Sequence, residues 1–345
     1  MEKRYCRKFH MKLLILTQIV DFEDPTLGFF HRWIEEFAKH SEKIVVICLK
    51  EGTHNLPENV RVCSLGKEKG FSRFRYIYLF YKYIFVERNN YNAVFVHMNH
   101  EYVLLGGLWW RLLRKKVAFW YVHRAVSLRL RLATLISNII FSTSEESFRI
   151  KTKKVNFIGH GIDIQQFPFS THQRKDILRV VSVGRVSSSK RIQEMIQTIN
   201  LLNSRGVRSK LIIVGAPVTE ADKKYTKKLQ DEAHEDVIWK GSVPHNKIQN
   251  VLRDADVFIN LSTTNSLDKA VLEAVSSGLP VVTSNIAFKS MLDPYGLFVP
   301  TITPELISKS ILSSQEISTQ ELSKQIQSKH ALNKLIERIV KIISI

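Results

Sequence analysis

The chain has 345 residues, of which 44% are hydrophobic and 24% are charged, a composition typical of a folded, soluble protein. Its length exceeds what one ordinary hydrophobic core supports, so we expect two domains. The three cysteines, Cys6, Cys48 and Cys63, are odd in number and form no Cys-x-x-Cys pair. The sequence therefore indicates neither a disulfide framework nor a zinc site, and it favours a reducing compartment.

The positive charge of the chain is large and unevenly distributed. The formal net charge is +19, and residues 1–154 carry 27 Lys and Arg against 14 Asp and Glu, a net +13. Residues 155–345 carry 24 against 18, a net +6. A basic first half indicates an anionic partner, and nucleic acid, an acidic membrane surface and a charged substrate all fit.

The first half alternates strand-like and helix-like segments. Residues 1–10 are short and basic and do not resemble a secretory signal, so we expect a disordered extension, with the folded part beginning at Met11. We predict strands at 12–17, 43–49, 56–64, 93–97, 117–122, 139–143 and 155–158, and helices at 29–40, 73–87, 102–113 and 128–137. This alternation predicts a doubly wound α/β domain over residues 11–158. The longest apolar run, residues 102–110, is too short to span a membrane.

A second α/β domain is predicted over residues 178–328. Residues 159–177 contain Gly and Pro and interrupt the pattern, which indicates an interdomain linker. Beyond it we predict strands at 178–183, 210–214, 237–240, 257–260, 281–283 and 297–299, and helices at 190–203, 223–233, 246–254, 269–277 and 304–312. Residues 313–328 are polar. Within 329–345, an amphipathic helix over 332–345 could pack back on the first domain.

The stretch from residue 265 to 280 combines a polar loop, a short helix and a helix stop. Gly278 stands where a left-handed residue ends a helix, and Pro280 follows because it cannot continue one. Glu273 is a lone acid on this helix. Periodicity favours a solvated helix face for it, although a carboxylate kept for a polar partner also fits.

The best candidate phosphate site is the pair Arg185 and Lys190, one directly after a predicted strand and the other at the start of the next helix. Ligands of open α/β sheets bind at the carboxyl ends of the strands. Helix starts usually carry acidic residues, so two cations at this position suggest a bound phosphate. The guanidinium would donate two parallel hydrogen bonds to it, and the ammonium would attract it as a compact positive charge. A solvated surface pair fits the positions equally well.

Three further features of the first half have two interpretations each. His123 follows a predicted strand, where a histidine is more often structural than catalytic. Gly28 opens a helix after a polar loop, which suits either the approach of a phosphate or a helix cap. The segments 71–88, 109–116 and 128–132 mix aromatic or aliphatic with basic residues, typical of core helices or of surfaces that bind acidic lipids. No nucleic-acid-binding motif accompanies them.

Taken in order, the motifs resemble glycosyltransferase family 4, whose GT-B fold has two Rossmann-like α/β domains facing across a cleft that holds a nucleotide sugar. Gly184, Arg185 and Lys190 are similar to the element that holds the donor diphosphate. The segment 241–244 resembles the loop whose backbone meets the base, and 161–167 the interdomain turn. The segment 272–282 resembles the end of a paired-acid motif.

The resemblance implies roles for particular residues. It implies that Arg185, Lys190 and His123 act in catalysis. The implied donor-binding residues are Gly28, Gly184, Val243, Asn265, Ser266, Leu267, Asp268 and Glu273, with Glu273 on the ribose. One position departs from the pattern, because Asn265 stands where the family has its first acid, eight residues before Glu273. We expect altered donor handling rather than loss of activity.

The implied reaction moves a hexosyl group from a nucleotide sugar to an acceptor hydroxyl with retained configuration, with no metal and no cofactor. The implied acceptor is a carbohydrate or a lipid-linked molecule in cell-surface polysaccharide or glycolipid synthesis. We expect the protein in the cytoplasm. Peripheral attachment of its first domain to the acidic inner face of the membrane is a further possibility of this interpretation. We expect no nucleic-acid partner. The alternatives are a catalytically silent GT-B protein that binds a nucleotide or partner, suggested by Asn265, a nucleic-acid-binding protein, suggested by the +19 charge, and a sugar-nucleotide epimerase.

Overall fold

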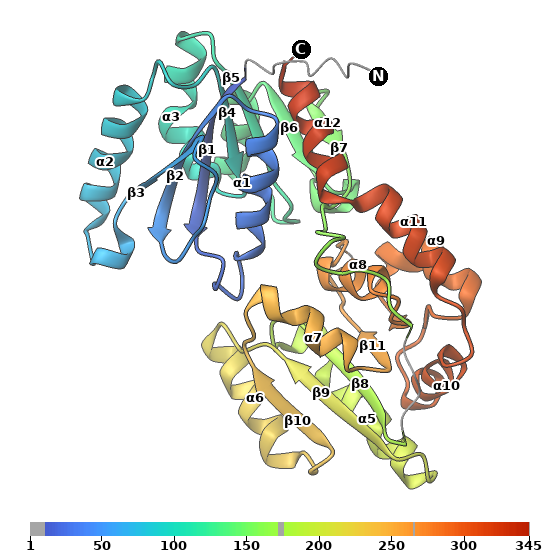
Figure 1. The fold of residues 1–345 in the computed structure, drawn as a ribbon. Helices are drawn as coiled ribbons and strands as arrows, with labels where there is room; N and C mark the ends of the chain where they lie inside the picture. Colours follow the sequence, from blue (N-terminus) through green and yellow to red (C-terminus); the bar gives the residue numbers. More distant parts are fainter. Residues whose placement is uncertain (1–10, 172–175, 265, 345) are drawn as a thin grey trace, which may run out of the picture. The chain divides into compact units, whose positions relative to one another are not determined.

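The chain folds into two α/β units (Figure 1). This computed structural model describes residues 11–171, 176–264 and 266–344, so the extension expected at residues 1–10 lies outside the described residues. Unit 1 runs to Gly161 and resumes at Leu332, and unit 2 is Ile162–Ala331. Within the described ranges, no helix has the length and apolar character needed to cross a membrane.

Unit 1 is built on a seven-stranded parallel sheet in the order β3-β2-β1-β4-β5-β6-β7. Its strands are β1 Lys12–Val20, β2 Lys43–Glu51, β3 Val60–Ser64, β4 Ala93–His97, β5 Lys116–Trp120, β6 Ile139–Ser142 and β7 Val155–Phe157. The central strand β1 is buried on both faces, which explains its uninterrupted apolar run. The strand order reverses between β1 and β4, so these two strands mark the switch point of the sheet.

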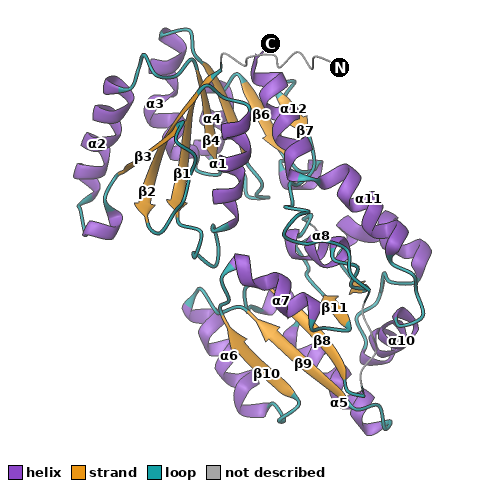
Figure 2. Ribbon diagram, viewed as in Figure 1, coloured by secondary structure: helices purple, strands orange, loops and turns teal. Residues whose placement is uncertain are grey.

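Helices cover both faces of the unit 1 sheet (Figure 2). One face carries α2 Arg73–Val86, α3 His100–Leu112 and α4 Leu128–Ile136, which share a core with alternate strand residues such as Leu14 and Val94. The opposite face carries α1 Phe29–Lys39 and α12 Leu332–Ser344, packed on Leu13 and Phe95. The C-terminal helix is therefore part of the unit 1 core, although the intervening segment 162–331 forms another unit.

Unit 2 has a five-stranded parallel sheet in the order β10-β9-β8-β11-β12, with its reversal between β8 and β11. The strands are β8 Leu178–Val183, β9 Ser209–Val214, β10 Val237–Gly241, β11 Val257–Asn260 and β12 Val281–Thr283. The helices are α5 Ile192–Ser204, α6 Glu220–Glu232, α7 Ile248–Arg253, α8 Lys269–Ser276, α9 Lys289–Leu292, α10 Pro304–Ser314 and α11 Gln320–His330. Helix α10 packs on α5, and α11 packs on α8.

Several elements of unit 2 differ from the sequence-based expectations. The helix expected from residue 190 begins at Ile192, because Arg191 adopts a left-handed backbone with φ 54° and ends the short turn Ser188–Lys190. The strand expected at 297–299 is reduced to one bridge, between Thr283 and Phe298. The polar segment 313–328 contains most of α11, which buries Leu322 and Ile326 and lets Ser323 donate a hydrogen bond to the carbonyl of Ser276 at 2.7 Å.

The start of the expected linker 159–177 is incorporated into unit 2. Ile162 and Phe167 are fully buried in the unit 2 core, and the Ile162 amide donates to the carbonyl of His330 at 2.8 Å. The chain enters unit 2 at Ile162 and leaves it after Ala331. These two ends of unit 2 are linked by this hydrogen bond and by a β-bridge between Ile162 and Ala331. Residues 172–175 lie outside the described residues.

The packing of α12 can be tested with Ile336, which is fully buried against the unit 1 sheet. Truncation to Ala removes three carbons and leaves a cavity, so we expect Ile336→Ala to lower the free energy of unfolding of unit 1 by about 2–5 kcal/mol. Urea titration measures the change. The exposed neighbour Glu337→Ala is the matched control and should shift stability by less than about 0.5 kcal/mol. Equal stabilities of the two variants would contradict the packing of α12.

Candidate functional site

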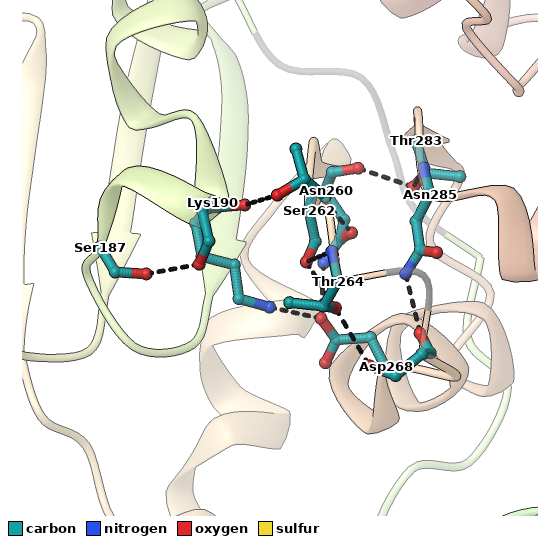
Figure 3. A network of polar contacts seen from close by, with 11 residues as sticks. Ser187, Lys190, Asn260, Ser262, Thr264, Asp268, Thr283 and Asn285 are labelled. Carbon is teal, nitrogen blue, oxygen red and sulfur yellow. Dashed lines mark hydrogen bonds and ion pairs between the residues drawn. The ribbon is translucent and has the colours of Figure 1, made fainter. Parts of the chain in front are cut away.

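Two charged side chains meet at the switch point of unit 2 (Figure 3). Lys190 follows β8, and Asp268 lies between β11 and α8, at the N-cap of that helix. The Lys190 Nζ lies 2.5 Å from the Asp268 Oδ2, and the side-chain amide of Asn260, the last residue of β11, donates to the same oxygen at 2.9 Å. Both charged side chains are less than one-fifth exposed. One carboxylate therefore joins the loops that follow β8 and β11.

The loop after β11 is held by a chain of hydroxyl contacts (Figure 3). The hydroxyl of Thr264 lies 2.9 Å from that of Ser262 and 3.0 Å from that of Ser266. Asn285, beyond β12, donates from its side chain to the carbonyl of Ser266 at 2.8 Å. The amide of Thr263 donates to the carbonyl of Ser189 at 3.0 Å. The loop is thus fixed on one side by the β8 loop and on the other by the segment after β12.

The backbones after β8 and β9 approach each other so closely that only glycine fits at position 215. Gly184 and Gly215 have φ of 145° and 140°, a region that other residues rarely adopt. A Cβ on Gly215 would lie 1.8 Å from the carbonyl oxygen of Gly184. Glycine at both positions keeps this edge of the sheet free of side chains next to Lys190, which suits the approach of a ligand to the backbone.

Arg185 extends from the same edge and is half exposed, with its Nε 4.0 Å from the Oδ2 of Asp222. Asp222 accepts from the backbone amide of Thr219 in the capping box that starts α6. This hydrogen bond and the Arg185 charge hold the pKa of Asp222 below its usual range. The arginine is therefore only loosely held, in contrast to Lys190.

Glu273 is buried and has two basic partners, so the solvated helix face favoured by its periodicity is wrong. Its side chain is 4% exposed, and its Oε1 accepts from His245 Nε2 at 2.8 Å and lies 3.3 Å from Lys269 Nζ. Burial alone would raise the pKa of Glu273, but the Lys269 ammonium and the His245 imidazole outweigh it and hold the pKa below the usual range. Burial likewise lowers the pKa of Lys269, against the opposing effect of Glu273.

The remaining predicted donor-binding residues of unit 2 lie in its loops. Val243 and Leu267 are half-buried and pack against the unit 2 core, so the side chains of both serve as loop anchors. Asn265, where the resemblance places an acid, lies outside the described residues. Asp268, three positions later, is ion-paired with Lys190.

Gly28 and His123 belong to unit 1, and each has a local structural role. Gly28 precedes α1 with an ordinary helical backbone, but a Cβ there would lie 2.5 Å from the carbonyl oxygen of Asp24, so its own loop requires glycine. His123 is exposed beyond β5, and its Nδ1 accepts from the amide of Ala125 at 3.1 Å. His97, at the end of β4, is buried and stacks on Phe30 with ring centroids 3.9 Å apart, which is a core role.

The sequence-based search missed four residues that hold the site together: Asn260, His245, Lys269 and Asp222. Lys269 precedes Glu273 by four positions on one helix, a spacing that signals an ion pair. His245 comes one residue after the loop 241–244 and contacts Glu273 only through the fold. Within residues 11–171, 176–264 and 266–344, no group of three or more His, Cys, Asp or Glu lies close enough to hold a metal.

Comparison with solved structures identifies the architecture. HepE of Anabaena, solved with UDP and glucose, superposes with a TM-score of 0.75 at 15% identity, over 97% of this chain and 100% of that one. Sucrose-phosphate synthase of Thermosynechococcus elongatus superposes with a TM-score of 0.70 at 14% identity, over 96% and 98%. The chain has the GT-B fold. Its two parallel-sheet units are the two Rossmann-like domains of that fold.

Sequence comparison adds a family match within unit 2. Residues 178–314 match the family model described as "Glycosyl transferases group 1". The chain is 27% identical over 176 residues to a subunit of the phosphatidylinositol N-acetylglucosaminyltransferase of Arabidopsis thaliana, covering 48% of this chain and 38% of that protein. It is 29% identical over 143 residues to the amylovoran biosynthesis glycosyltransferase AmsK of Erwinia amylovora, covering 38% and 34%. The matches therefore span little more than a third of each relative.

The buried group around Glu273 gives a pH-dependent stability prediction. Glu273→Gln removes the charge but not the bulk, and it leaves the mostly buried Lys269 without its counter-ion. Breaking a buried pair from one side costs about 3–5 kcal/mol, so we expect that loss of unfolding free energy at neutral pH. Because the folded-state pKa of Glu273 is lowered, its contribution is complete above the ordinary carboxylate pKa and is lost as pH falls through the folded value.

The measurement is urea unfolding of both proteins at neutral and acidic pH. The difference between them should shrink as the pH falls. Glu232→Gln is the matched control, because Glu232 is more than half exposed and lies 3.9 Å from Lys228. It should change stability by less than about 1 kcal/mol. A Glu273→Gln protein as stable as this control at neutral pH would show that the buried contacts contribute nothing.

Proposed function

We propose that the protein is a glycosyltransferase that moves a sugar from a nucleotide-sugar donor, bound in unit 2, to an acceptor hydroxyl. The observation that carries the proposal is the position of Lys190, Asp268 and Asn260 at the switch point of the unit 2 sheet, inside the segment 178–314 that matches the family model. Switch points are where open α/β sheets bind nucleotides. The UDP and glucose in the Anabaena HepE structure support UDP as the nucleotide.

The chemistry of Lys190 and Arg185 fits a leaving diphosphate. Breaking the bond between the anomeric carbon and the diphosphate leaves negative charge on a phosphate oxygen, and fixed cations beside that oxygen lower the barrier. Lys190 supplies a nearly buried ammonium held in place by Asp268, and Arg185 supplies a half-exposed guanidinium. These two cations serve in place of a metal, and transfer proceeds with retained configuration.

The remaining donor contacts follow from the same edge of the sheet. Gly184 lets the diphosphate approach the backbone, and the loop of Val243 meets the base. Glu273 is ionised because of its two basic partners, and an ionised carboxylate accepts hydrogen bonds such as those that ribose hydroxyls donate. Ser266, Leu267 and Asn265 complete the donor side through the loop that Asn285 holds in place.

The proposed acceptor is a carbohydrate or a lipid-linked molecule, which unit 1 binds. His123, beyond β5, is the proposed catalytic histidine of unit 1, and Gly28, before α1, is a proposed donor-binding residue. The names of the two relatives support this class, since one name specifies phosphatidylinositol, a lipid, and the other specifies amylovoran biosynthesis. The proposed role is therefore in cell-surface polysaccharide or glycolipid synthesis on the cytoplasmic side of a membrane.

Lys190→Ala tests the catalytic assignment. Removing one such donor typically costs about 2.7–4 kcal/mol of transition-state stabilisation, so turnover should fall roughly a hundredfold or more. A panel of UDP-sugars and GDP-sugars is first screened for thermal stabilisation of the wild-type protein, and release of the nucleoside diphosphate is then measured with the donor that binds. Lys223→Ala is the control, because Lys223 is an exposed lysine of α6 that pairs with Glu220. Unchanged turnover in Lys190→Ala would refute the assignment.

The same assay separates the rival functions. Stabilisation by a nucleotide sugar without turnover would favour a catalytically silent GT-B protein. A product nucleotide sugar with one sugar carbon inverted would identify an epimerase. If no member of the panel binds and the protein binds nucleic acid with a steep dependence on salt, the proposed function is wrong.

Asp268→Asn tests whether Asp268 competes with the diphosphate for Lys190. The change removes a negative charge 2.5 Å from the ammonium, so UDP should bind about tenfold more tightly, a gain of about 1.4 kcal/mol. Turnover should fall at the same time, because the lysine loses the contact that positions it. Calorimetry with UDP measures the first effect. Asp254→Asn, an exposed acid of unit 2, changes the net charge equally and should leave both quantities unaltered.

A further inference from the structure

Helix α2 of unit 1 is apolar on both sides. Its inner side buries Phe80 and Ile84 against the sheet, as expected of a core helix. Its outer side nevertheless exposes Phe74 at 86%, Tyr78 at 66% and Val86 at 60%. The fourteen residues of the helix include three cations and no acid. A helix with apolar residues on all faces is normally enclosed by protein or lipid. We therefore expect the outer side of α2 to bind a partner.

The exposed apolar surface continues from α2 onto α3 and α4, because all three helices share the core on one side of the sheet. Phe85 of α2 contacts Trp109 of α3, with ring centroids 4.7 Å apart, and α3 packs on α4. We call this surface the α2–α4 face; its exposed large apolar side chains are Phe74, Ile77, Tyr78, Phe85, Val86, Leu108, Leu112, Leu128, Leu132 and Leu135. The described parts of α1 and α12, on the other side of the sheet, expose no large apolar side chain.

The charges on the α2–α4 face are almost all positive. Its exposed basic residues are Arg73, Arg75, Lys82, Arg111, Arg129 and Arg131. Among the described residues of the three helices, Glu101 is the one acid, and it lies 4.0 Å from Arg129. Glu87, just after α2, is buried and paired with Arg61. Aromatic and aliphatic side chains interspersed with arginines form the pattern that binds the headgroup region of anionic bilayers.

An apolar groove opens beside this face, at the carboxyl ends of β2, β3 and β4. It has a volume of about 230 Å³, and its lining residues include Leu49, Leu65, Phe80 and Leu105. Arg73 and Ile77 of the α2–α4 face also line it. The groove therefore continues the exposed apolar surface inward and offers space for part of a hydrocarbon chain, with a guanidinium nearby for a phosphate.

We propose that the α2–α4 face docks on an anionic lipid bilayer, with the exposed aromatic and aliphatic side chains entering the headgroup region and the arginines binding lipid phosphates. Charge complementarity favours an anionic bilayer over a neutral one, and the apolar groove lined by Arg73 and Ile77 favours a lipid over an acidic protein. Docking goes beyond the proposed reaction, because it needs neither a donor nor turnover.

Flotation of the full-length protein with vesicles tests the docking. The protein should float with vesicles of phosphatidylcholine and phosphatidylglycerol and partition at least tenfold less onto phosphatidylcholine alone. The double variant Phe74→Ser, Tyr78→Ser should lose at least tenfold in partitioning onto the anionic vesicles. Its thermal midpoint should stay unchanged, because both side chains are largely exposed. Ile286→Ser, Leu306→Ser is the matched control, since it removes two exposed apolar side chains from unit 2.

A separate charge variant, Arg73→Glu, Arg75→Glu, should reduce partitioning on anionic vesicles but not on neutral ones. Protein that stays at the bottom with anionic vesicles would overturn the proposal, as would equal flotation of the Phe74, Tyr78 variant and its control. It would also be overturned if the protein without vesicles is a dimer that the Phe74, Tyr78 variant dissociates, because a second copy would then be the occupant. Loss of flotation when nucleic acid is removed would point to nucleic acid instead and would equally reject bilayer docking.

Discussion

All strand pairs in both sheets are parallel, and this one constraint sends every loop between a strand and the following helix to the same edge of its sheet. In unit 2 the strand order reverses between β8 and β11, so the loops after these two neighbouring strands lie next to each other. Lys190 and Asp268 meet there although 78 positions separate them in the chain. The candidate site is thus a product of topology first and of side-chain chemistry second.

The buried group around Glu273 extends this arrangement to a third loop. His245 follows β10, and its imidazole donates to Glu273 on α8, while its carbonyl accepts from the side chain of Gln166 at 2.8 Å. The loop after β10 is therefore attached to α8 and to the segment that enters unit 2. Such an arrangement explains how a short loop with exposed residues keeps a defined backbone at the edge where a nucleotide base is proposed to bind.

Much of the fold could be predicted because the strands are buried on both faces and read as apolar runs. Residues 12–17 are such a run, and the same rule located the strands ending at Val183 and Asn260. Hydrophobic periodicity did not predict elements whose buried side chains are polar. Helix α11 buries Ser323 through a hydrogen bond to a neighbouring helix, so its sequence looks solvated. The left-handed Arg191 gives no signal, because glycine is the residue that usually marks such a backbone.

The site was predictable in its location but not in its contacts. Strand ends and the order of the motifs pointed to Arg185, Lys190 and Glu273. The partners of these residues come from elsewhere in the chain: Asp222 lies near Arg185, Asp268 pairs with Lys190, and His245 pairs with Glu273. Spacing along one helix could have identified Lys269, but contacts between separate loops depend on the sheet order, which the sequence of one chain does not state.

The position of Asp268 at the start of α8 has a consequence for the electrostatics of the site. Because the carboxylate precedes the first turn of a helix, the helix dipole continues to stabilise its charge when Lys190 turns towards another anion. Without a ligand, the centre of the site is close to electrically neutral, even though the chain as a whole carries +19. If the site binds a diphosphate as proposed, its affinity would be set by an exchange of partners at one ammonium group rather than by long-range attraction. Such an exchange depends less on ionic strength than the net charge of the chain suggests.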